Sequence, residues 1–206
     1  MPNLGGFVTE FGWDGKHAGI IILVSQLVTT DDNSPFILNS DQLVCSILPE
    51  SPAPKSVTFS PGGLLFKPGG TANKVVNCGN NVVITASRMI DFTKGQVDYI
   101  LGSNPLGMSY MVGYGSKFPK RIHHRASVLP SMDQQPGNIE CHAGTPYFET
   151  QAPNQNLLIG AIVGGPAEND SFEDSRYNVY NVHSRSQTHT SMHLLLMFWL
   201  TLSPYF

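Results

Sequence analysis

The chain has 206 residues, of which 41% are hydrophobic and 13% are charged, and its formal net charge is −3. This length and apolar content are sufficient for one domain with a buried core. The 12 Lys and Arg residues form no long runs, which argues against nucleic acid as a partner. The 20 Gly and 15 Pro residues predict many turns and long loops.

Neither end of the chain carries a recognisable targeting segment. The N-terminal MPNLGGFVTEF lacks the basic start and the apolar run of a signal peptide, so the chain is intracellular or its true beginning lies upstream. The apolar run at 194–202 is shorter than the roughly 20 residues that a membrane-spanning helix needs. We therefore expect no membrane anchor.

The cysteine and histidine spacings predict no metal site. Cys45, Cys78 and Cys141 lie far apart without any Cys-x-x-Cys spacing, and their odd number leaves at least one thiol free. His189 and His193 are four residues apart and could share one face of a helix as metal ligands. No third ligand stands near them, so we expect neither a bound metal nor another cofactor.

The first half of the chain shows two amphipathic segments and one glycine-rich segment. Apolar residues at three- and four-residue spacing over 12–27 predict a helix, with a buried strand as the alternative. A shorter amphipathic segment at 41–48 predicts a short helix in a stretch otherwise broken by prolines. The two Gly pairs of SPGGLLFKPGG (60–70) predict a loop with a buried apolar middle.

The clearest helix is predicted over 85–101, with Thr85 as a possible N-cap and Gly102 as the stop. Its apolar face would consist of Met89, Ile90, Val97, Ile100 and Leu101. Breakers predict a loop over 126–156, and the apolar run at 157–165 is too short for its pattern to distinguish strand from helix. Helices joined by long loops, with almost no alternating pattern, predict an all-α fold.

The most informative stretch is SYMVGYGSKFPKRIHHR (109–125), which combines aromatic, cationic and loop-forming residues. Imidazole and guanidinium groups hydrogen-bond to hydroxyls, and aromatic faces pack against the C–H side of a sugar ring. A sugar is therefore the natural ligand. The alternatives are a solvated connection or a phosphate contact.

With Ser109, Gly115, Lys117 and the Ile-His-x-Arg at 122–125, this stretch resembles the histidine-containing signature of glycoside hydrolase family 9, the endo-β-1,4-glucanase family. Further segments resemble successive blocks of the plant enzymes in the same order: FGWDGKHAG (11–19), SPGGLLFKPGG (60–70), GQVDYILGSNPLGMSYMVGYG (95–115), PGNIECHAGTPYF (136–148) and LLIGAIVGGPAENDSFEDSR (157–176).

The resemblance implies an (α/α)6 barrel, so we expect an all-α chain that forms part of such a barrel with long loops. The run at 157–165 would be one of the barrel helices. Only TANKVVN stands between Gly70 and Cys78, where the plant enzymes have a long apolar helix, so one barrel helix is expected to be missing. Residues 1–182 would be the C-terminal portion of the family's catalytic domain, followed by a divergent tail over 183–206.

The resemblance also supplies candidate catalytic residues. Inverting glycosidases need a general base and a general acid about 6.5–9.5 Å apart. Phe172, Glu173 and Asp174 match the opening of the second family signature, which makes Asp174 the expected active-site aspartate. The glutamate expected nine residues later is His183 here, and no Asp or Glu follows Asp174. No segment matches the family motif that carries the base.

His123 and Arg125 are expected beside the scissile bond as an active-site histidine and a substrate-binding arginine. The implied function is that of an endo-β-1,4-glucanase, which hydrolyses cellulose-type glucan with inversion. The alternative is a catalytically inactive fragment that binds glucan weakly. The implied partner is β-1,4-glucan and the implied location is secreted or at the cell wall, without a cofactor.

The tail has a specific explanation. SRSQTHTSMH (184–193) stands where the family motif continues as Ser-Glu-Pro-x-Thr-Tyr-Ile-Asn-Ala, and codons for the present residues can be chosen so that a shifted frame reads that motif. We therefore expect a frameshift near 179–184. Sequencing the transcript across these codons tests this expectation, and an intact present frame would refute it.

Overall fold

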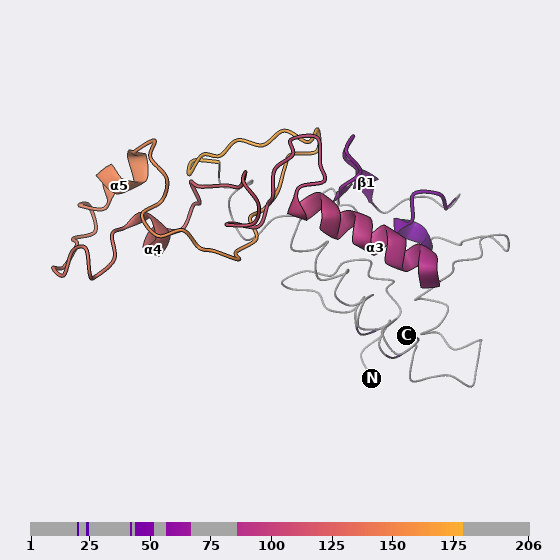
Figure 1. The fold of residues 1–206 in the computed structure, drawn as a ribbon, viewed down its shortest axis with the longest axis horizontal. Helices are drawn as coiled ribbons and strands as arrows, with labels where there is room; N and C mark the ends of the chain where they lie inside the picture. The colour runs from indigo at the N-terminus through magenta and orange to yellow at the C-terminus, as the bar shows by residue number, and fades with distance from the viewer. Residues whose placement is uncertain are drawn as a thin grey trace, which may run out of the picture. The chain divides into compact units, whose positions relative to one another are not determined.

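The computed structural model describes residues 20, 24, 42, 44–51, 57–66 and 86–178. Contacts divide the chain into two units, Met1–Val97 with Thr190–Phe206, and Asp98–His189. The elements of the described residues are β1 (Thr58–Phe59), β2 (Leu65–Phe66), α3 (Ala86–Leu101), α4 (Arg125–Val128) and α5 (Thr145–Glu149) (Figure 1). Loops connect them over long stretches, as the Gly and Pro content predicts.

Several predictions fall wholly or partly outside these residues. Ile20 and Val24 are helical, but the rest of the helix expected at 12–27 is not described. The segment between Gly70 and Cys78 and the tail over 183–206 also lie outside the described residues. The short helix expected at 41–48 is confirmed in its described part, since Gln42 and residues 44–47 are helical.

The glycine-rich segment forms a small hairpin in the first unit. β1 and β2 pair antiparallel, and the Gly63 N–H donates to the Ser60 carbonyl at 2.8 Å inside the turn. Leu64 and Leu65 are buried, which confirms the buried apolar middle. The two short strands were not expected, because the sequence shows Gly pairs but no alternation.

Helix α3 confirms the predicted helix and its end, and Gly102 follows with a φ of +128° that favours glycine. Its buried residues are Met89, Phe92, Thr93, Gln96, Tyr99 and Ile100. Gln96 is buried because its Oε1 accepts from the Leu65 N–H at 2.7 Å and its Nε2 donates to the Gly63 carbonyl at 2.9 Å. A prediction of buried positions from apolar residues alone therefore does not include Gln96.

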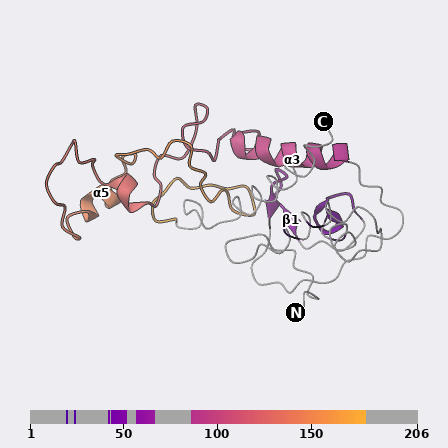
Figure 2. The same ribbon diagram turned by 90° about the horizontal axis from the view of Figure 1, so that it is seen from below.

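In the second unit, the segments 110–112 and 160–163 run side by side (Figure 2). The Val163 N–H donates to the Tyr110 carbonyl at 3.0 Å, and the Val112 N–H donates to the Ala161 carbonyl at 2.8 Å. The helix expected at 157–165 is therefore wrong. Gly160 has a φ of +85°, outside the right-handed helical range, and backbone groups of this run bond to another segment.

The expectation of an all-α fold is met only in part. The described residues contain one long helix, short helices, the β1–β2 hairpin and a bridge between Met111 and Ile162. No helix of the described part of the chain is both long and apolar enough to cross a membrane. Cys45 is disulfide-bonded and Cys141 is a free, exposed thiol, in agreement with the odd cysteine count.

Candidate functional site

A cluster of aromatic side chains in the second unit connects the segment around Phe172 to α3 and to the loop that follows it. Tyr110 is fully buried, stacks on Tyr99 with centroids 6.2 Å apart, and meets Phe172 at 5.3 Å. The Tyr99 hydroxyl donates to the Asp170 carboxylate at 2.5 Å. Burial, followed by the negative charge of Asp170, raises the pKa of Tyr110, so this phenol stays neutral. The cluster fixes the chain shortly before Asp174.

Asp174 binds the backbone of the loop that leads to His123. Its Oδ2 accepts from the Lys120 N–H at 3.0 Å and its Oδ1 accepts from the Arg121 N–H at 2.9 Å. The Arg121 Nε lies 3.9 Å from Oδ2. Each carboxylate oxygen is thus engaged with this loop, and hydrogen bonds to an ionised acceptor are among the stronger ones in proteins.

His123 is oriented from two sides. Its Nδ1 lies 2.7 Å from the Arg176 carbonyl oxygen. Its ring meets the Phe148 ring edge-on, with centroids 5.5 Å apart and planes at 87°. The structure therefore places His123 beside the segment that carries Asp174. Asp174 in turn binds the backbone of the loop that contains His123.

His123 and Arg125 line one cavity of about 350 Å³. Its lining includes residues of α4, which begins at Arg125, and of α5. These two helices contact each other (Figure 1). The other lining residues are His124, Val128, Leu129, Ile139, Glu140, Cys141, Gly144, Thr145 and Phe148. Imidazole, guanidinium and carboxylate groups can hydrogen-bond to the hydroxyls of a sugar, and the apolar side chains can pack against the C–H face of its ring. Asp174 does not line this cavity.

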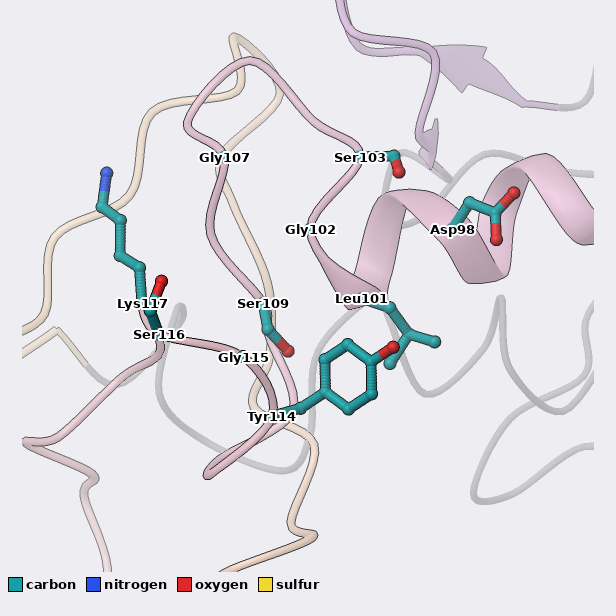
Figure 3. Close-up of a pocket in the computed structure, with 10 residues that line it drawn as sticks. All are labelled: Asp98, Leu101, Gly102, Ser103, Gly107, Ser109, Tyr114, Gly115, Ser116 and Lys117. Carbon is teal, nitrogen blue, oxygen red and sulfur yellow. The ribbon is translucent and has the colours of Figure 1, made fainter.

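The first half of the signature borders a second pocket of about 310 Å³ at the end of α3 (Figure 3). Ser109, Gly115 and Lys117 line it, together with residues such as Asp98 and the half-exposed Tyr114. Figure 3 shows the Lys117 side chain directed away from α3. Its Nζ donates to the Leu106 carbonyl at 2.8 Å, and its own carbonyl accepts from the Ser109 N–H at 2.9 Å. These two signature residues thus stabilise the loop itself.

Two residues that the sequence analysis did not single out, Asn154 and Arg176, lie buried beneath the His123 loop. The Arg176 Nε donates to the Asn154 Oδ1 at 2.7 Å. Asn154 donates through Nδ2 to the Ile122 carbonyl at 2.8 Å and to the Ser127 hydroxyl at 2.9 Å. Burial, followed by the positive charge of Arg121, lowers the pKa of Arg176, but a guanidinium stays protonated at neutral pH. Nothing in local periodicity marks such a network.

The chain resembles known endoglucanases. The model of glycosyl hydrolase family 9 matches residues 3–183. Endoglucanase 6 of Oryza sativa subsp. japonica is 44% identical, over 82% of this chain and 38% of that protein. Endoglucanase 4 of Arabidopsis thaliana is 47% identical, over 84% of this chain and 40% of that protein.

Among solved structures, the endoglucanase CelQ from Clostridium thermocellum, complexed with cellobiose and cellotriose, matches with a TM-score of 0.64 at 22% identity. The match covers 95% of this chain and 31% of that one, and it shows a shared fold. The chain spans about two fifths of the length of the curated relatives named above.

The contacts of Asp174 predict a local stability effect. Asp174→Ala removes the acceptor for two backbone N–H groups in one exposed and one partly buried hydrogen bond, each of which contributes about 0.5–1.5 kcal/mol. We expect the Lys120 and Arg121 amides to exchange with deuterium at least about tenfold faster, as amide exchange measured by NMR will show. Glu173→Ala, at the exposed neighbouring carboxylate, is the control. Equal exchange in both variants would contradict the role of Asp174 in holding this loop.

Proposed function

Because the chain belongs to glycosyl hydrolase family 9, we propose that its function is that of an endo-β-1,4-glucanase, which cleaves internal bonds of cellulose-type glucan with inversion. We propose further that it folds as part of an (α/α)6 barrel and that its glucan lies in the cavity beside α4 and α5. The observation that carries this proposal is the cavity itself, where His123 and Arg125 meet apolar and aromatic side chains.

The chemistry of the lining supports glucan as the ligand. Arg125 is exposed at the start of α4, and its planar guanidinium offers a fork of N–H donors. Phe148 lines the same cavity and supplies an aromatic surface. The likeness to CelQ, which was solved with cellobiose, cellotriose and cellotetraose, supports an oligomer of β-1,4-linked glucose. We also propose a secreted or cell-wall location, because the chain belongs to glycosyl hydrolase family 9.

We assign distinct roles to the predicted site residues. His123 and Arg125 hydrogen-bond to glucosyl hydroxyls, which aids catalysis where the bonds strengthen in the transition state. Asp174 serves the active site by holding the backbone at Lys120 and Arg121, since both of its oxygens accept from those amides.

Hydrolysis makes a further demand on the site, and this favours a second candidate function. An inverting mechanism needs two carboxyl groups across the scissile bond. Among the described residues that line the cavity, Glu140 is the one carboxylate. Glucan binding with little or no hydrolysis by this chain is therefore the alternative function.

One pair of assays separates the two functions. We expect the purified 206-residue chain to bind cellotetraose by calorimetry, and His123→Ala to weaken binding about tenfold, the effect of one lost hydrogen bond. Release of reducing ends from carboxymethyl cellulose that disappears in Asp174→Ala would establish hydrolysis by this chain. Binding with release at the level of the blank would establish the alternative function, glucan binding with little or no hydrolysis. A folded sample that neither binds nor hydrolyses would refute both functions.

Cys141 provides a second test, because this exposed free thiol lines the proposed glucan cavity. We expect cellotetraose at ten times its Kd to slow labelling of Cys141 by a maleimide about tenfold, since only the unoccupied fraction reacts. Mass spectrometry of the labelled peptide measures the rate. Maltotetraose, with α-1,4 linkages, is the matched control and should leave the rate unchanged. Equal rates with and without cellotetraose would place the glucan elsewhere.

A further inference from the structure

Arg176 is a charged side chain in an unusual environment. It is 3% exposed, and its guanidinium donates to four neutral oxygen atoms. The Nε–H bonds to the Asn154 side chain, Nη1 to the carbonyls of Phe148 and Thr150, and Nη2 to the Ala152 carbonyl at 2.6 Å. A buried charge is tolerated only where such acceptors replace its water, so the surrounding chain is organised around this group.

Three contacts connect Arg176 to His123. Its own carbonyl oxygen lies 2.7 Å from the His123 Nδ1. Its Nε holds Asn154, which in turn binds the carbonyl of Ile122, the residue before His123, at 2.8 Å. Its Nη1 binds the carbonyl of Phe148, whose ring packs edge-on against the His123 ring. The histidine is thus held at its ring nitrogen, at the backbone before it and through the contact of its ring with Phe148.

The first contact also determines the tautomer of His123. A carbonyl oxygen only accepts hydrogen bonds, so the Nδ1 of His123 carries the proton. In the neutral ring, Nε2 is then the acceptor nitrogen. A glucan hydroxyl bound by Nε2 of the neutral ring would therefore donate a hydrogen bond to His123.

We propose that Arg176 is a positioning residue, which fixes the ring orientation and the Nδ1–H tautomer of His123 through its carbonyl, Asn154 and Phe148. The effect of Arg176 on glucan binding rests on the proposed function, because this effect requires that His123 contacts the glucan. The tautomer itself does not depend on that assumption.

The test reads the tautomer directly. In long-range ¹H–¹⁵N spectra of the 206-residue chain, His123→Gln identifies the His123 signals. We expect the Nδ1–H pattern in the unsubstituted chain and a mixture of both tautomers in Arg176→Lys, which keeps the charge but loses the fork of donors. Arg88→Lys is the matched control, because Arg88 pairs with Glu50 in the other unit. A merely structural role for Arg176 would leave the His123 pattern unchanged in a folded Arg176→Lys, and that result would overturn the proposal.

A second variant decides the case if Arg176→Lys does not fold. Asn154→Asp retains an oxygen for the Arg176 Nε but loses the N–H donors to the Ile122 carbonyl and the Ser127 hydroxyl. We expect it to shift the His123 signals toward the mixed pattern, and an unchanged pattern would overturn the proposal equally.

Ligand binding is measured on the same samples. We expect Arg176→Lys, or Asn154→Asp in its place, to weaken cellotetraose binding about tenfold, as His123→Ala does. Loss of the tautomer without any change in affinity would overturn the link to the ligand. No binding by the unsubstituted chain would refute the proposed function, while the tautomer result would still decide the role of Arg176.

Discussion

The buried guanidinium of Arg176 is the constraint on which the candidate site depends. A charge at 3% exposure is stable only if polar partners replace water, and here they are the carbonyls of Phe148, Thr150 and Ala152 with the side chain of Asn154. Removing any one acceptor leaves an N–H unpaired in the interior. The Arg176 guanidinium therefore holds the segment from the end of α5 to Asn154 in one conformation, because this segment supplies its hydrogen-bond acceptors.

The site is built from loops, and the same principle positions each of its side chains. The Asp174 carboxylate holds the backbone before His123, and the Asn154 amide holds the carbonyl of Ile122. A loop without helix or sheet hydrogen bonds must satisfy its backbone groups in this way. The polar residues that stabilise the loop are consequently inseparable from those that present His123 and Arg125 to the cavity.

This dependence explains what the sequence could and could not predict. The periodic apolar face and Gly102 predicted α3 and its end, and the mixture of aromatic and cationic residues pointed to the stretch containing His123 and Arg125. The run at 157–165 was expected to be helical, but pairing with 110–112 and the positive φ of Gly160 give it another conformation. Its apolar character reveals neither which segment its backbone groups bond to nor that Val163 is buried while Ile159 is exposed.

The buried polar groups Gln96, Asn154 and Arg176 escaped prediction for a related reason. Each is stable only through partners that are distant along the chain, such as Leu65 for Gln96 and Phe148 for Arg176.

The last of these buried polar residues, Arg176, precedes the frameshift expected near 179–184. Such a frameshift would change later residues but would leave Asn154 and Arg176, which position His123, unchanged. In the proposed function, glucan binding through His123 is for this reason separable from hydrolysis, because Asn154 and Arg176, which hold His123, precede that region.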